Sequence, residues 1–126
     1  MATSNSLTQQ KCKPCEGGVD PLSAEQVSDL IKQTPEWLAD ESTTTIVRTF
    51  TLENFQEAIL FMNMIARLAE EEGHHPDLFL HQYKNVTVSL TTNAIGGLSE
   101  NDFIEAAKID VLYETVISKQ QGGNEL

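Results

Sequence analysis

The sequence has 126 residues, a length that suits one domain with a single modest core. Its 19 acidic residues against 8 Lys and Arg residues give a formal net charge of −11, and this sign repels phosphate backbones, so we expect no direct nucleic-acid binding. No segment reaches the roughly 18 apolar residues that a membrane helix needs, and the N-terminal residues lack a signal-peptide core. We therefore expect no membrane association and a cytoplasmic location, with the nucleus as an alternative.

Polar composition marks both ends of the chain. Residues 1–20 and 119–126 bury little apolar surface, so we expect two flexible tails around a single domain at residues 21–118. Cys12 and Cys15 form one C-x-x-C motif in the first tail, which is too few cysteines for a disulfide framework. Half of a zinc site or a redox pair would also fit this spacing, but no second pair follows, so two reduced thiols are the simpler interpretation.

The first part of the domain predicts a short helix and then extended chain. Ser23 followed by Gln26 resembles a capping box, and the apolar residues after it recur at helical spacing until Pro35 stops the helix. A short extended piece at residues 37–38 and a strand at residues 43–50, rich in β-branched residues, follow.

A longer helix comes next, with Thr51 as its expected N-cap. Its core-facing residues repeat at three-and-four spacing. They are Phe55, Ala58, Ile59, Met62, Ile65, Ala66 and Ala69. A further stripe of Phe61, Met64 and Leu68 widens the apolar surface, so we expect part of it to contact another subunit. Pro76 prevents the helix from running past His75.

The last part of the domain predicts two strands and a helix. Residues 78–83 and 85–91 have strand character, and the second of these alternates apolar with polar residues. After a Gly-Gly loop, Ser99 and Asp102 have the spacing of another capping box and start the final helix. The order helix, strand, strand, helix, strand, strand, helix predicts an α+β fold, with a four-stranded antiparallel sheet and the helices packed on one face.

The three histidines, His74, His75 and His81, fall within eight residues, and the first two flank the forced helix stop. An imidazole can give and take a proton near neutral pH, so a histidine pair suits general acid and base catalysis. Side chains of adjacent residues usually diverge and no cysteine lies nearby, so we expect no metal site. Histidines that only cap the helix or face solvent remain the simplest alternative.

A wider pattern surrounds these histidines. Glu70, His74-His75-Pro76, Tyr83, position 93 and Asp102 follow one another at spacings that resemble the signature of pterin-4a-carbinolamine dehydratases. The resemblance runs from about Leu22 to Tyr113. It implies dehydration of 4a-hydroxytetrahydropterin to quinonoid dihydropterin, in the recycling of tetrahydrobiopterin. The pterin is then the substrate, and no cofactor is expected.

The resemblance also implies roles for individual residues. His75 is expected to be the main proton-transfer residue and His74 the second, with Glu70 orienting His74 by a hydrogen bond, although Glu70 could equally be a solvated helix carboxylate. Pro76 and Asp102 are expected to help bind the pterin, but capping the last helix could also explain Asp102.

Two further pterin-binding candidates carry their own alternatives. Trp37 could pack beside the flat pterin ring or be buried in the core. Asn93 departs from the family, which has histidine or sometimes tryptophan at this position. Asparagine can hold a substrate group by hydrogen bonds but does not titrate near neutral pH, which predicts a loss on the order of a hundredfold in rate. His81 is a weak candidate to replace the missing group.

Other functions remain open at this point. Some members of the family bind and stabilise dimers of a homeodomain transcription factor, so a pterin-binding or protein-binding scaffold is the alternative to an enzyme. A different pterin pathway, such as molybdenum-cofactor metabolism, would keep the same pocket. In either case we expect a homo-oligomer, a dimer or a tetramer.

Overall fold

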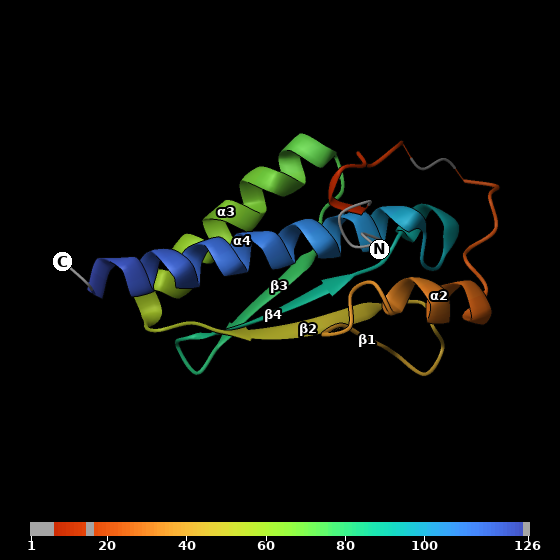
Figure 1. The fold of residues 1–126 in the computed structure, drawn as a ribbon. Helices are drawn as coiled ribbons and strands as arrows, with labels where there is room; N and C mark the ends of the chain where they lie inside the picture. Colours follow the sequence, from red (N-terminus) through yellow and green to blue (C-terminus); the bar gives the residue numbers. More distant parts are fainter. Residues whose placement is uncertain (1–6, 15–16, 125–126) are drawn as a thin grey trace.

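The computed structural model describes residues 7–14 and 17–124. Their helices and strands follow the predicted order and form an α+β fold (Figure 1). The elements are α2 (Ala24–Ile31), β1 (Leu38–Ala39), β2 (Ile46–Thr51), α3 (Phe55–Glu72), β3 (Asp77–His81), β4 (Asn85–Leu90), the short 3-10 helix η1 (Asn93–Ile95) and α4 (Glu100–Asn124). No helix in this described part of the chain is both long enough and apolar enough to span a bilayer.

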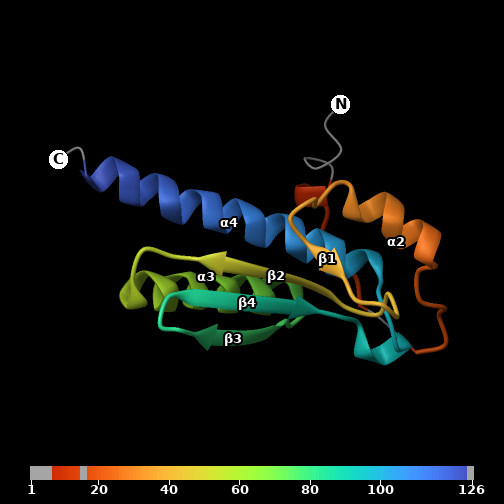
Figure 2. The same cartoon turned by 90° about the horizontal axis from the view of Figure 1, so that it is seen from below.

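The four strands form one antiparallel sheet in the order β1-β2-β4-β3, as Figure 2 shows from below. Ile46 of β2 pairs with Leu90 of β4, and Asp77 of β3 pairs with Ser89. This register brings the end of β4 beside the start of β3, where the chain arrives from α3. His74 and His75, which precede β3, therefore lie at this end of the sheet.

The hydrophobic core lies between the sheet and the helices α3 and α4, which Figure 1 shows on the same side of the sheet. In β4, Val86, Val88 and Leu90 are each fully buried, while the residues between them are only partly covered. Alternation of this kind is typical of a sheet with one covered face. The prediction of helices on one face of an antiparallel sheet is confirmed.

The expected starts of α3 and β2 were wrong in detail. The N-cap of α3 is Asn54, whose side chain accepts a hydrogen bond from the Glu57 N–H, whereas Thr51 ends β2. The asparagine amide and the threonine hydroxyl each provide an oxygen that can cap a helix, so residue type alone did not distinguish the two positions. Strand β2 starts at Ile46 instead of residue 43, because Asp40 accepts hydrogen bonds from backbone N–H groups in residues 44–45 and holds them in a turn.

The described residues near both ends of the chain make contacts or continue a helix beyond the expected domain. Leu7 is 3% exposed, and the Cys12 N–H donates to Glu72 at 2.9 Å. Lys13 exchanges two hydrogen bonds with the Asn101 side chain, so residues 11–13 lie against the end of α3 and the start of α4. At the other end, α4 continues to Asn124, past the boundary we drew at residue 118. Cys15 lies outside the described residues.

Candidate active site

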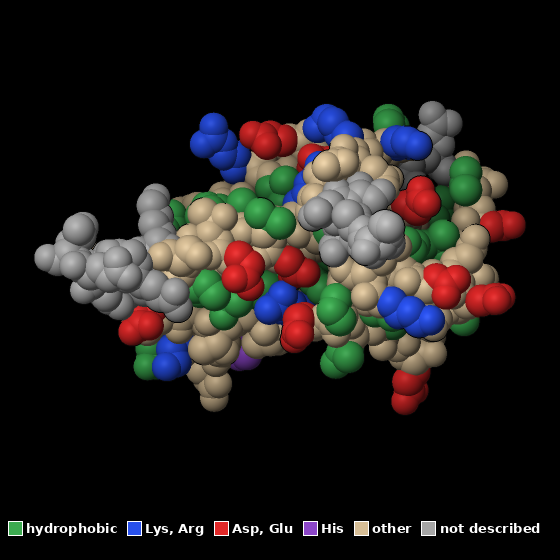
Figure 3. All heavy atoms as spheres, viewed as in Figure 1, with side chains coloured by type: hydrophobic (Ala, Val, Ile, Leu, Met, Phe, Trp, Pro, Cys, Tyr) green, Lys and Arg blue, Asp and Glu red, His purple; other side chains and the backbone are tan. Residues whose placement is uncertain are grey.

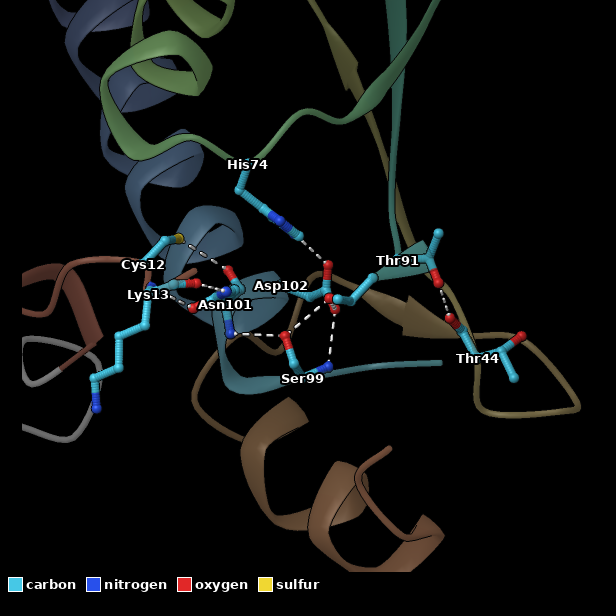
Figure 4. A network of polar contacts seen from close by, with 9 residues as sticks. Cys12, Lys13, Thr44, His74, Thr91, Ser99, Asn101 and Asp102 are labelled. Atoms are coloured by element: carbon cyan, nitrogen blue, oxygen red, sulfur yellow. Dashed lines mark hydrogen bonds and ion pairs between the residues drawn. The ribbon is translucent and has the colours of Figure 1, made fainter. Parts of the chain in front are cut away.

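His74 and Asp102 form a buried pair. The His74 Nε2 atom lies 2.6 Å from the Asp102 Oδ1 atom, and the two residues are 9% and 0% exposed (Figure 4). His74 follows Gly73, the left-handed C-cap of α3, while Asp102 is in the first turn of α4. At this distance the imidazole donates a strong, charge-assisted hydrogen bond to the carboxylate.

Further hydrogen bonds fix the Asp102 carboxylate in place. Its Oδ2 atom accepts from the Thr92 hydroxyl at 2.7 Å and from the Ser99 N–H at 2.9 Å. The second of these bonds is the helix-capping contact, so one carboxylate both caps α4 and holds His74. Asp102 is fully buried and both of its carboxylate oxygens are engaged in hydrogen bonds within the protein. Its expected role in binding the pterin stays a prediction.

The environment of His74 favours its charged form. Burial lowers the pKa of His74, but the hydrogen bond and the charge of Asp102, together with the charge of Glu105, outweigh burial and raise the pKa above its usual value. The protonated form of His74 is thus stabilised by its surroundings. The hydrogen bond to Asp102 also places that proton on Nε2 and leaves Nδ1 as the second ring position.

His75 pairs with Glu70, which corrects the partner we expected for that glutamate. The His75 Nε2 atom lies 2.7 Å from the Glu70 Oε2 atom, and the side chains are 61% and 77% exposed. Gly73 has a φ of 68°, so the chain leaves the helix axis there and His75, not His74, comes back over the last turn. An exposed pair of this kind orients the ring but contributes about 1 kcal/mol or less to stability.

Two further residues that we expected to bind the pterin, Pro76 and Asn93, differ in their exposure. Pro76 follows the histidine pair directly and is partly buried, while Asn93 starts η1 and is exposed. Its neighbour Thr92 donates a hydrogen bond to Asp102, so Asn93 is adjacent in the chain to a residue that contacts the buried pair. Both lie at the same end of the sheet as His74, in keeping with the pairing of β3 and β4.

Trp37 lies elsewhere, in the core. It is 1% exposed, its Nε1–H donates to Asp110 at 2.9 Å, and its ring meets Phe50 edge-on. Arg48 donates to the same Asp110 oxygen at 2.7 Å. The structure thus matches the core alternative for Trp37, since a ring this buried offers no face to a ligand.

His81 does not join the other two histidines. It ends β3, whereas Pro76 immediately precedes that strand, and five residues of extended chain span about 16 Å. On the uncovered face of the sheet its ring stacks on Phe79 with centroids 4.8 Å apart, and its Nε2 atom lies 2.9 Å from the Thr87 hydroxyl. Across residues 7–14 and 17–124, no three His, Cys, Asp or Glu side chains are grouped so as to hold a metal ion.

Sequence reasoning missed one residue beside this site. Glu105, in α4, is fully buried, and neither of its carboxylate oxygens has a hydrogen-bond partner among the described residues. Burial raises the pKa of Glu105 to about 7. The sequence did contain a signal, because Glu105 interrupts the otherwise apolar run of residues 103–107 in α4.

Comparison with known proteins adds an independent observation. The family model described as pterin 4 alpha carbinolamine dehydratase matches residues 20–112. The chain belongs to this family. A relative from Nitrosomonas eutropha, named "Putative pterin-4-alpha-carbinolamine dehydratase", is 49% identical over 108 residues that cover 84% of this chain and 92% of the relative. A relative of the same name from Methylococcus capsulatus is 45% identical over 107 residues, covering 85% and 93%.

Solved structures of the pterin dehydratase type share the fold. A transcriptional coactivator/pterin dehydratase from Brucella melitensis superimposes with a TM-score of 0.70 at 28% identity, over 75% of this chain and 99% of that one. A pterin dehydratase-like protein identified as a RuBisCO assembly factor in the alpha-carboxysome has a TM-score of 0.54 at 23% identity, over 62% and 89%. The second likeness concerns the fold alone.

In this pterin dehydratase family member, the two histidines have different environments. His74 is buried with a fixed carboxylate and a raised pKa, whereas His75 and its partner Glu70 are exposed to solvent. The site thus combines one buried and one exposed imidazole, and imidazole is the side chain most often used in general acid and base catalysis.

Proposed function

We propose that the chain dehydrates a 4a-hydroxytetrahydropterin to the quinonoid dihydropterin, as a step of tetrahydrobiopterin recycling in the cytoplasm. Family membership supports the reaction class. The observation that carries the proposal is the pair of adjacent histidines, each with its own carboxylate at 2.6 and 2.7 Å. The pterin itself is the substrate, and the proposed chemistry uses no cofactor.

The reaction breaks the bond between C4a and the hydroxyl group. A proton must reach that oxygen so that it leaves as water, and the N5 proton must be removed so that the nitrogen electrons form the new double bond. We assign the first proton to His74, whose pKa is raised by Asp102 against the opposing effect of burial. We assign removal of the N5 proton to His75, the main proton-transfer residue, because its exposed ring can reach a ligand and pass the proton to water.

The remaining residues position this pair. Asp102 and Glu70 act through His74 and His75 respectively, and Pro76 fixes the chain direction after them. Asn93 is exposed at the start of η1 and can bind a substrate hydroxyl or ring nitrogen through its amide, but it cannot share the proton. The proposed rate is therefore lower than a histidine at the same position would give, by an amount on the order of a hundredfold.

The proposed experiment compares turnover with binding. A 4a-hydroxytetrahydropterin is generated in place, its loss is followed spectroscopically, and binding of a stable pterin is measured by calorimetry in the same samples. We expect the wild-type chain to bind pterin and to accelerate the loss, and the Asn93→His variant to accelerate it further. Wild-type binding without acceleration would refute the enzymatic proposal.

A scaffold is the second candidate, and two observations favour it. The solved relative from Brucella melitensis is described as a transcriptional coactivator as well as a dehydratase. In addition, Figure 3 shows hydrophobic side chains exposed among charged ones on the face formed by α3 and α4, where Ile59, Leu60 and Val111 are 38%, 49% and 51% exposed. Such a surface suits a homo-oligomer, a dimer or a tetramer, or a protein partner. Turnover that appears only in Asn93→His would favour the scaffold.

A further inference from the structure

Glu105 is a buried acid without an obvious structural reason. It is 0% exposed, and both carboxylate oxygens lack hydrogen-bond partners within the described residues. A buried carboxylate in this condition costs far more than a neutral side chain, and proteins usually relieve the cost by protonating the group. Neither the helix cap nor the hydrophobic core requires an acid here. A role in the neighbouring site is therefore worth testing.

The position of Glu105 points to His74. It follows Asp102 by three residues in α4, so both carboxyl groups project from the same side of the helix. The charge of Glu105 acts on His74 and raises the pKa of that imidazole, after the opposing effect of burial and the two contributions of Asp102. The carboxyl of Glu105 is thus a second acid beside the histidine that Asp102 already holds.

Charged groups from the end of α3, from the segment after it and from α4 itself act on Glu105. His74 and His75, from the segment after α3, favour its ionised form, while Glu72 at the end of α3 and Asp102 disfavour it. The charge of Glu72 is itself balanced by ion pairs with two lysines, Lys108 at 2.7 Å and Lys11 at 3.7 Å.

The N-terminal segment contributes a neutral group. Burial first, and then the charges of Glu105 and Glu72, raise the pKa of the half-buried Cys12 thiol to about 12. The thiol therefore stays protonated and does not compensate a charge on Glu105. His74 is therefore the nearby titratable group whose ionisation is coupled to that of Glu105.

We propose that Glu105 is a positioning residue of the histidine site, and that it and the His74–Asp102 pair titrate as one coupled unit. When Glu105 is ionised it helps Asp102 to keep the proton on His74, and when it is protonated Asp102 acts alone. Glu105 thereby adds a titratable carboxyl to the site, in which Asn93 stands at the position of the family's histidine. The kinetic consequence rests on the proposed dehydration, whereas the coupling is a property of the resting protein.

The test is an NMR titration of the full chain from about pH 5 to pH 9, which spans the ordinary histidine range. Side-chain carbon and nitrogen signals report His74 and the Glu105 carboxyl in the wild type, in Glu105→Gln and in the control Glu114→Gln, an exposed acid on the same helix. We expect the Glu105 carboxyl to titrate together with His74. In Glu105→Gln, His74 should titrate in a single step at a pH lower by about half a unit to one unit. In Glu114→Gln it should titrate as in the wild type.

Two results would overturn the proposal. One is a wild-type Glu105 carboxyl that titrates at the ordinary pH of an exposed glutamate, a measurement that needs no variant to fold. The other is a His74 titration that is the same in Glu105→Gln and in the wild type. Both readouts are independent of turnover, so a chain that fails to dehydrate pterin can still show the coupling. Conversely, an active enzyme with an uncoupled Glu105 would refute only this inference.

Discussion

The stability of the protein is predicted to fall as the pH rises, through Glu105. Burial raises the pKa of this residue to about 7 from its ordinary value of 4.5. The folded chain therefore binds a proton more tightly than the unfolded chain does, and the stabilisation is fully present below about pH 4.5 and lost as the pH rises through about 7. A difference of about 2.5 pKa units at about 1.4 kcal/mol per unit gives roughly 3 kcal/mol in total, of which about 2.5 kcal/mol lies between pH 5 and pH 8.5.

The Glu105→Gln variant isolates this contribution. Glutamine has the shape of protonated glutamate and cannot ionise, so the variant retains the packing at position 105 while losing the proton linkage of this residue. Urea unfolding at both pH values and one protein concentration gives the free energy of unfolding. We expect the difference between wild type and Glu105→Gln to change by about 2.5 kcal/mol across this pH interval, and by less than about 0.5 kcal/mol for the exposed control Glu114→Gln. An equal pH dependence in wild type and Glu105→Gln would refute the reasoning.

Three other substitutions test separate parts of the structure. Gly73→Ala forces a Cβ onto a backbone with φ of 68° and should cost about 1 kcal/mol in urea unfolding; an unchanged stability would mean that the left-handed cap is absent. Trp37→Phe removes the donor to Asp110 and should cost about 1–3 kcal/mol in the same assay while leaving pterin KM unchanged; a raised KM would place the ring at the ligand. Asp102→Asn should lower the pKa of His74 in an NMR titration, because it removes the charge that raises this pKa, and an unchanged value would contradict the pairing.

Local chemistry made much of the fold predictable. Ser23 and Gln26 form both bonds of the expected capping box, and the apolar–polar alternation seen in the sequence of β4 matches the burial of its alternate residues. The helix α3 does not run past His75, as Pro76 predicted, but Gly73 ends it three residues before Pro76 by adopting a left-handed conformation. These features depend on residues within a few positions of one another, which is why a single sequence reveals them.

Contacts between distant segments were not predictable in the same way. Residues 11–13 look like part of a loose tail by composition, yet they bond to Glu72 and to Asn101, which lie 60 and 88 positions further along. The choice of Glu70 as partner for His75 depends on the direction in which the chain leaves α3, and sequence spacing does not give this direction. The residue types of a segment predict its own secondary structure, whereas these hydrogen bonds depend on which other element packs beside the segment.

In the candidate site, too, local features were predictable from the sequence, whereas contacts between distant residues were not. His74 and Asp102 are separated by 28 positions, so only the resemblance to a known family suggested that they act together. That resemblance could not reveal that Asp102 is fully buried and hydrogen-bonded to His74. The buried position of Glu105 among apolar residues was visible in the sequence, but its unpaired state required the packing of α3, α4 and the N-terminal segment to be known.

The rate at which 4a-hydroxytetrahydropterin loses water in the presence of this chain tests the central claim most directly. The substrate is generated in place, and its loss is compared among wild type, His75→Gln and the control His81→Gln, which alters a histidine at the far end of β3. We predict acceleration proportional to the wild-type concentration, a decrease of about a hundredfold in His75→Gln, and no change in His81→Gln. A rate in His75→Gln equal to the wild-type rate would contradict catalysis by the histidine pair.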